Sequence, residues 1–156
     1  MQKLTVISLT NKLSDWSFLA CEEYSKRLKP AFALNIIDIP LKKRTNTSNI
    51  AQILEKEAQL MQQAVPENSY LIALDLTGKS FTSETLANKF DKLSQITNHL
   101  CFLIGGPEGL SSLLKTKCRE IWSLSPLTLP HQLAKIIFLE TTYRCWCINK
   151  SHPYHK

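Results

Sequence analysis

The chain has 156 residues, of which 44% are hydrophobic and 21% charged, the balance of an ordinary soluble globular protein. Nineteen lysines and arginines against 13 acidic residues give a net charge of +6, which favours polyanionic partners without requiring one. No apolar segment approaches the roughly 20 residues of a membrane span, and no signal peptide is recognisable. Five cysteines, an odd number, sit among apolar neighbours. We expect one cytoplasmic domain, residues 1–156, without membrane contact.

The first half of the chain predicts an alternation of strands and helices. A β-branched run predicts a buried strand over residues 3–9. Ser14 is expected to cap the helix that follows, with Trp16 on its buried face. A second strand is expected over residues 32–39, where a proline ends the apolar run.

A polar and basic segment, residues 42–48, separates the second strand from the next helix. Three basic residues open the segment, and hydroxyl and amide residues follow without a hydrophobic anchor. Two interpretations stay open: a solvated surface loop, or a mobile flap that contacts phosphates. Ser48 is expected to cap an amphipathic helix over residues 50–64.

The second half of the chain continues the alternation. An apolar run predicts a strand over residues 70–76, interrupted by Asp75 and followed by a turn at residues 77–79. Ser83 is expected to cap the next helix. The remaining predicted elements are a strand over 100–104, a short helix around Leu113, a strand over 121–124 and a helix over 131–149. Because strand and helix alternate five times, the sequence favours an α/β fold with a parallel sheet flanked by helices.

Two loops at expected strand ends are unusual in composition. Residues 105–109 contain three glycines, which permit backbone conformations closed to other residues. In residues 123–129, leucines alternate with hydroxyl residues around Pro126. Each loop has two interpretations. The glycine loop is a tight strand-to-helix turn, and the leucines of the second loop are core residues. Alternatively, both loops are pocket walls that offer apolar side chains and backbone groups to a flat heterocycle.

The familiar ligand-binding motifs fit this chain poorly. The spacing of the glycines matches neither G-x-x-x-x-G-K-[ST] nor G-x-G-x-x-G, and Glu108 would repel a pyrophosphate. Cys145 and Cys147 lie close to two histidines, but helical residues two apart point about 200° apart, so one ion cannot easily take both thiols. We expect no metal site, and a pocket at the glycine loop suits a ligand without phosphate.

The C-terminal tail, residues 151–156, is expected to be too short for a further element. It is either disordered, or it contacts RNA together with the end of the last helix. Arg144, Tyr154 and His155 combine a cation, a stacking ring and a proton-transfer group, as phosphate grip and base stacking require. Since the tail is short and polar, its removal should cost little stability.

Taken together, these segments resemble the bacterial ribosomal large-subunit RNA methyltransferase H family. The resemblance covers the whole chain, and its motifs are specific in combination. It is carried by Leu103–Leu110, Trp122–Ser125, Leu129–His131, Glu140, Tyr143–Arg144 and His152–Lys156. The chief departure is the cysteine-rich segment 145–147, which does not touch the cofactor motif.

The resemblance implies a fold, a reaction and an assembly. It implies a SPOUT-type domain with a C-terminal trefoil knot, which binds S-adenosylmethionine. The implied reaction is methylation of N3 of a pseudouridine in 23S ribosomal RNA, within the ribosome or its large subunit, by a homodimer. S-adenosylmethionine carries no phosphate. This agrees with a glycine loop that matches no phosphate-binding motif and contains an acidic residue.

The resemblance also implies the residues of the site. Gly105 would let the backbone approach the ligand closely, so a valine at this position should displace the ligand and leave the fold intact. Arg144, Tyr154 and His155 would hold the RNA and handle the proton of N3. The residues that would line the cofactor pocket are Leu74, Gly105, Leu124, Ser125, Pro126, Leu127, Thr128 and Leu129.

Hypotheses from different functional classes remain open. An enzyme requires a cofactor pocket, whereas a non-catalytic RNA-binding α/β module requires only the basic tail and the basic segment. A nucleotide-binding α/β protein of unrelated function is disfavoured by the missing phosphate motifs. Titration with S-adenosylmethionine and, separately, with ATP would discriminate among them.

Overall fold

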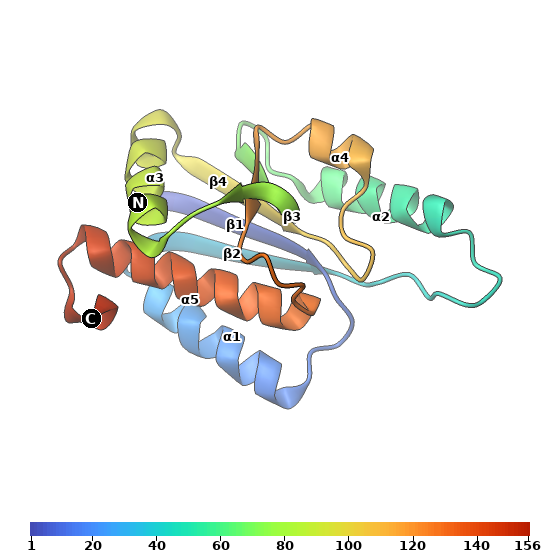
Figure 1. The fold of residues 1–156 in the computed structure, drawn as a ribbon, viewed down its shortest axis with the longest axis horizontal. Coiled ribbons are helices and arrows are strands. Elements are labelled where there is room, and N and C mark those ends of the chain that lie inside the picture. The colour runs from blue at the N-terminus through green and yellow to red at the C-terminus, as the bar shows by residue number, and fades with distance from the viewer.

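Five parallel strands from both halves of the chain form a single sheet (Figure 1). The computed structural model describes residues 1–156. The elements are β1 (Gln2–Leu9), α1 (Asp15–Leu28), β2 (Phe32–Ile39), α2 (Ile50–Ala64), β3 (Tyr70–Ser80), α3 (Ser83–Ile96), β4 (His99–Ile104), α4 (Ser112–Thr116), β5 (Glu120–Ser123), α5 (His131–Asn149) and a 3₁₀ turn, η1 (Pro153–His155). The strand order is β2-β1-β4-β3-β5, and every pairing is parallel. The predicted α/β fold with a parallel sheet is confirmed.

Helices cover both faces of the sheet and create two hydrophobic cores. On one face α5 packs against both α1 and α3, around core residues such as Leu4, Phe102 and Phe138. On the other face α2 and α4 enclose a smaller core around Ile7 and Met61. Successive strand residues point to opposite faces, so strands that are apolar at most positions supply both cores. None of these helices combines the length and the apolar composition that crossing a membrane requires.

Two helices begin at caps next to the predicted ones. Asn49, rather than Ser48, caps α2 with its side chain. Thr82, rather than Ser83, caps α3 and forms a capping box with Thr85. Residues with good capping side chains are adjacent at both sites, so local preference alone does not choose between them.

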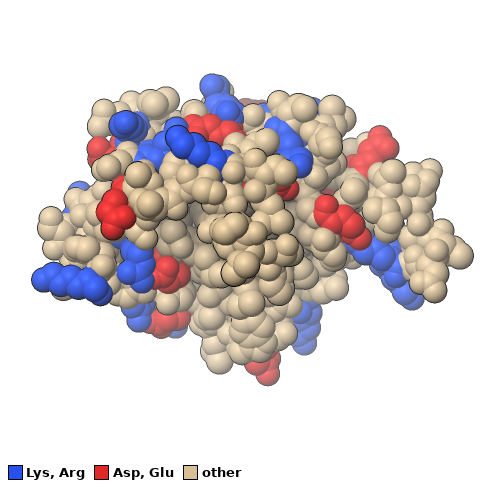
Figure 2. Space-filling model, in the orientation of Figure 1, with Lys and Arg blue, Asp and Glu red and all other residues tan.

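Helix α1 buries Leu28, as its apolar spacing predicts, but its first turn buries a different face. Trp16 is 55% exposed, whereas the neighbouring Ser17 is fully buried. An offset of one residue rotates the buried face by about 100°. Phe18 and Leu19 are exposed as well, so the first turns of α1 present apolar side chains to solvent. Figure 2 shows that the middle of this face of the molecule, over α1 and α5, carries no charged side chains.

Strand β3 continues through the turn predicted at residues 77–79. Its pairing with β5 shifts register between Leu74 and Lys79, both of which pair with Trp122. Gly78 permits the close approach, because a Cβ atom there would lie 2.6 Å from the backbone of β5. A glycine after an apolar run predicts a turn locally, but here tertiary pairing extends the strand beyond the glycine.

The C-terminal tail is folded against α5 rather than disordered. Its η1 turn places the Tyr154 ring edge-on against Tyr143, with 4.8 Å between the ring centroids. The Tyr154 hydroxyl donates a hydrogen bond to Glu140 at 3.1 Å. Removing the tail would therefore remove packing and a hydrogen bond, so we expect a larger stability cost than the little that a short polar tail predicts.

Candidate active site

A cavity of about 420 Å³ opens at the carboxyl edge of the sheet. It is bounded by the ends of β3, β4 and β5, by the loops that follow β4 and β5, and by the first turn of α5. Ligands of parallel α/β sheets bind at this edge. Pro126 is exposed and does not line the cavity. Seven of the eight predicted pocket residues do: Leu74, Gly105, Leu124, Ser125, Leu127, Thr128 and Leu129.

The glycine loop, residues 105–109, is both a tight turn and a wall of the cavity. The Gly109 amide donates to the Gly106 carbonyl at 3.0 Å, and Gly109 has a φ of 75°. A Cβ atom on Gly105 would lie 2.5 Å from the carbonyl carbon of Gly109. A valine at position 105 would therefore disrupt the loop itself, which corrects the expectation that its side chain would simply occupy the ligand's space.

The proline loop, residues 124–129, leaves most of its backbone groups unpaired. None of them takes part in a backbone–backbone hydrogen bond. Two side-chain hydrogen bonds stiffen the loop: Ser123 Oγ donates to the Ser125 carbonyl at 3.0 Å, and the Leu127 amide donates to Ser125 Oγ at 2.9 Å. The remaining N–H and C=O groups are available to the polar edge of a ligand, next to apolar leucine side chains.

Three polar residues of β3 and α4 that the sequence patterns did not assign to the site also line the cavity: Asp75, Thr77 and Lys115. The Asp75 carboxylate accepts hydrogen bonds from the Thr77 amide, at 3.0 Å, and from the Thr77 hydroxyl, and Lys115 Nζ lies 3.5 Å away. Burial alone would raise the pKa of Asp75, but these partners outweigh it and lower the pKa. The sequence feature that could have identified Asp75 as a site residue is its place as an acidic residue at the end of an apolar strand.

The N-terminus of α5 lies at the cavity and has no side-chain cap. Pro130 occupies the cap position, and His131 lines the cavity. The Nε2 atom of His131 is buried without a hydrogen-bond partner. Burial lowers the pKa of His131, which favours the neutral ring at pH 7. The uncapped amides and this ring nitrogen are polar groups that a ligand can satisfy.

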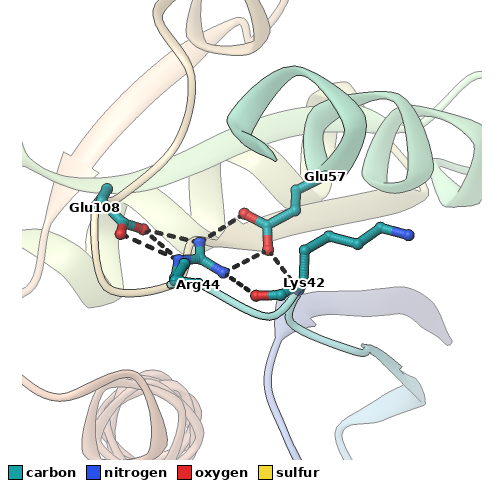
Figure 3. A network of polar contacts seen from close by, with 4 residues as sticks. All are labelled: Lys42, Arg44, Glu57 and Glu108. Carbon is teal, nitrogen blue, oxygen red and sulfur yellow. Dashed lines mark hydrogen bonds and ion pairs between the residues drawn. The ribbon is translucent and has the colours of Figure 1, made fainter. Parts of the chain in front are cut away.

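Glu108, at the cavity wall, is paired rather than free. Arg44 of the basic segment lies 2.8 Å from Glu108 and 2.8 Å from Glu57 of α2 (Figure 3). Hydrogen bonds from Arg44 lower the pKa of Glu108. The pairing weakens the argument that Glu108 repels a pyrophosphate. The basic segment is also more than a solvated loop, because Arg44 points inwards.

Arg144, Tyr154 and His155 lie together at the other end of α5. Arg144 Nη2 donates to Glu140 at 2.6 Å, and the guanidinium carbon lies 5.0 Å from the centroid of the Tyr154 ring. Burial, together with the neighbouring Tyr24 and Glu140, raises the pKa of Tyr154, so its hydroxyl stays protonated at neutral pH. His155 is exposed beside this cluster.

The two predicted groups of residues are separated within one chain. Helix α5 begins at the cavity with His131 and carries Arg144 thirteen positions later. At about 1.5 Å per residue, the two positions are roughly 20 Å apart along the helix axis. The fold therefore assembles the predicted pocket residues, but it does not bring the predicted catalytic residues of the same chain to them.

Comparisons with known proteins agree with the geometry. Residues 2–155 match the family model described as "Predicted SPOUT methyltransferase". Two relatives, from the Paris and Lens strains of Legionella pneumophila, are each 54% identical over 156 residues and covered completely, as is this chain. Both bear the name "Ribosomal RNA large subunit methyltransferase H".

A solved structure extends the likeness to the fold. TrmJ from Z. mobilis ZM4 matches with a TM-score of 0.50 at 15% sequence identity, over 93% of this chain and 70% of that one. The trefoil knot implied by the sequence motifs stays a prediction. Since the family model and the relatives cover this chain from end to end, the chain belongs to the SPOUT methyltransferases, and among them to the ribosomal RNA large subunit methyltransferase H family.

Proposed function

We propose that this chain transfers the methyl group of S-adenosylmethionine to N3 of a pseudouridine in the 23S RNA of the large ribosomal subunit. The printed name of the two relatives supports large-subunit ribosomal RNA as the substrate. S-adenosylmethionine is the methyl donor of SPOUT methyltransferases. The observation that carries the proposal is the cavity at the carboxyl edge, which gathers seven of the eight residues that the family motifs assign to the cofactor.

The cavity suits S-adenosylmethionine in size, polarity and charge. Its volume of about 420 Å³ lies within the usual range of small-molecule sites. Leu124, Leu127 and Leu129 offer apolar surface for an adenine ring, and the unpaired backbone groups of the same loop suit the edge of a base. Asp75 supplies a negative charge for a cationic ligand, and the N-terminus of α5 suits a carboxylate.

The residues at the C-terminal end divide the remaining tasks. S-adenosylmethionine supplies a methyl group on a sulfonium sulfur, so the protein must align the N3 nitrogen and remove its proton. Tyr154 is a hydrogen-bond donor and a stacking surface rather than a base, since its raised pKa keeps the hydroxyl protonated. We assign the RNA phosphate to Arg144 and the N3 proton to the exposed ring of His155.

A homodimer completes the site. Pocket and tail lie roughly 20 Å apart on one helix, so one chain does not join them. At the pocket end, Trp16 and Leu19 of α1 and Leu133 of α5 are exposed. The face of the molecule in Figure 2 lacks charged side chains in its middle. A two-fold contact across this face with antiparallel α5 helices would place each tail at the pocket of its partner.

Calorimetric titration of the purified chain tests the cofactor, and methyl transfer tests the reaction. We expect saturable binding of S-adenosylmethionine and none of ATP. The chain should then transfer the labelled methyl group of S-adenosylmethionine to large ribosomal subunits. Nucleoside mass spectrometry should find this methyl group on N3 of a pseudouridine. Binding of ribosomal RNA without binding of S-adenosylmethionine would instead support a non-catalytic RNA-binding module.

The substrate form and the assembly have their own measurements. Methyl transfer should be compared among intact ribosomes, isolated large subunits and free 23S RNA. We propose that an assembled particle is required, so free 23S RNA should not be methylated. Sedimentation at micromolar concentration should give a mass near twice 17.8 kDa. A monomer at that concentration would contradict the shared site.

A further inference from the structure

Arg44 joins three parts of the chain through a single guanidinium group (Figure 3). Nη1 and Nη2 donate to the two carboxylate oxygens of Glu57, at 3.1 and 2.8 Å. Nε and Nη2 donate to Glu108 at 3.0 and 2.8 Å, and Nη1 also donates to the Lys42 carbonyl at 2.7 Å. These bonds employ all five N–H groups of the side chain.

The Glu57 side of the network is fixed by burial. The Glu57 side chain is 1% exposed, and Arg44 is its ion-pair partner. The Lys42 amide donates a further hydrogen bond to Glu57, at 3.0 Å. A buried carboxylate without a partner is strongly unfavourable, so Glu57 holds Arg44 in place. The opposite edge of the guanidinium is then presented to Glu108.

The Glu108 side of the network reaches the cavity. Glu108 lies in the glycine loop, 64 positions after Arg44, and lines the cavity. An apolar contact supports the same loop, since a Cβ atom on Gly106 would lie 2.6 Å from Leu41 Cδ2. Within the loop only one backbone hydrogen bond, between Gly109 and Gly106, is formed. The segment 41–44 therefore supports a wall of the cavity that has few bonds of its own.

We propose that Arg44 is a positioning residue for S-adenosylmethionine, which holds the glycine loop in its binding conformation through Glu108. The inference rests on the proposed function, in which the glycine loop is a wall of the cofactor pocket. Arg44 does not line the cavity, so its effect passes through Glu108. A loop that is already ordered loses less conformational entropy when the ligand binds.

Arg44→Lys is the principal variant. Lysine keeps a positive charge for Glu57, but a single ammonium group lacks the planar fork that bridges both carboxylates. The affinity for S-adenosylmethionine should fall by roughly 2- to 30-fold, the range for residues that act on a site through another contact. Lys43→Met is the matched control, because it removes an exposed cation from the same segment and leaves the network untouched. Unchanged affinity in Arg44→Lys would overturn the proposal.

A double-mutant cycle shows whether Arg44 acts through Glu108. Glu108→Ala leaves the pair of Arg44 with Glu57 intact, so it tests the link even where Arg44→Lys folds poorly. We expect Glu108→Ala to weaken binding. Adding Arg44→Lys should then cause no further loss, since the route through Glu108 is already cut. Losses that simply add would overturn the proposal.

Hydrogen exchange without ligand separates this inference from the proposed function. The amide of Gly109, which donates the loop's one backbone hydrogen bond, should exchange faster in Arg44→Lys and in Glu108→Ala than in the parent chain, and Lys43→Met should match the parent. Unchanged exchange would overturn the role of Arg44. A parent chain that binds no S-adenosylmethionine would refute the proposed function, while exchange would still report whether Arg44 orders the loop.

Discussion

The polar groups at the two ends of helix α5 differ in how far they are hydrogen-bonded. At the N-terminal end, the backbone groups of residues 124–129 are largely unpaired, and Nε2 of His131 is buried without a partner. At the C-terminal end, Glu140 accepts hydrogen bonds from Arg144 and from the Tyr154 hydroxyl. One end leaves backbone hydrogen-bonding capacity unused inside a cavity, and at the other end side chains hold one another in place.

The difference assigns the two ends different tasks. Unused backbone groups beside leucines suit a small ligand that supplies the missing partners. Side chains that hold one another in place form a rigid surface, which suits contact with a large RNA. Because the two ends of one α5 lie roughly 20 Å apart, a single reaction that uses both needs a second copy of the chain.

Deleting Pro153–Lys156 should have the largest effect. We expect methyl transfer to fall by about 10²- to 10⁴-fold, the usual contribution of a positioned proton-transfer group. The affinity for S-adenosylmethionine should stay within a few-fold, because no tail residue lines the cavity. Loss of the Tyr154 contacts should also lower the free energy of unfolding by roughly 1–3 kcal/mol.

Single-turnover methylation and calorimetry, both below the melting temperature, separate these effects. Tyr154→Phe is the control, since it keeps the ring and loses only the hydrogen bond to Glu140. Full activity after the deletion would show that the tail has no part in the reaction. Loss of cofactor affinity together with activity would place the tail in the pocket wall.

Mixing two inactive variants should restore activity if the ends meet across a dimer. The tail-deleted chain keeps its pocket, and Gly105→Val keeps its tail but has a disrupted glycine loop. After subunit exchange, half of the dimers are mixed and each has one intact site, so about a quarter of parent activity should return. Mixed dimers that are present yet inactive would contradict the shared site.

Leu127→Asp should weaken binding of S-adenosylmethionine without affecting folding. Leu127 is 71% exposed yet lines the cavity, so a carboxylate there is tolerated in the free chain but unfavourable against an apolar ligand surface. We expect about a tenfold loss, equivalent to about 1.4 kcal/mol. Leu113→Asp is the matched control, since Leu113 is 68% exposed on α4 and outside this cavity. Equal calorimetric affinity of the two variants would move the pocket elsewhere.

Asp75→Asn should have the smallest effect, and the effect should depend on pH. The folded chain lowers the pKa of Asp75, so the charged carboxylate contributes stability above its unfolded pKa of about 4. This contribution is lost as pH falls through the lower folded pKa. We expect a difference of about 1 kcal/mol at pH 7 in urea unfolding, shrinking towards pH 3. An equal difference at both pH values, or the same behaviour in exposed Asp91→Asn, would contradict the assignment.

The sequence by itself determined the order and type of the strands and helices and most of the pocket. Apolar periodicity and capping residues act between near neighbours, so they are readable without the fold. The family motifs fall on the loops after β4 and β5, and parallel strands bring the ends of neighbouring strands to one edge. Gly105 and all of residues 124–129 except Pro126, distant in sequence from Leu74, therefore meet it at the cavity.

Tertiary structure alone decided what depends on contacts between distant segments. Packing against α5 and the sheet selected the buried face of α1, and pairing with β5 extended β3 past Gly78. Local pattern marked Arg44 as one cation of a basic segment, while the fold turned it inwards between Glu57 and Glu108. The length of α5 set the distance between pocket and tail. Each of these outcomes was selected by burial or pairing between remote segments, which a local pattern does not encode.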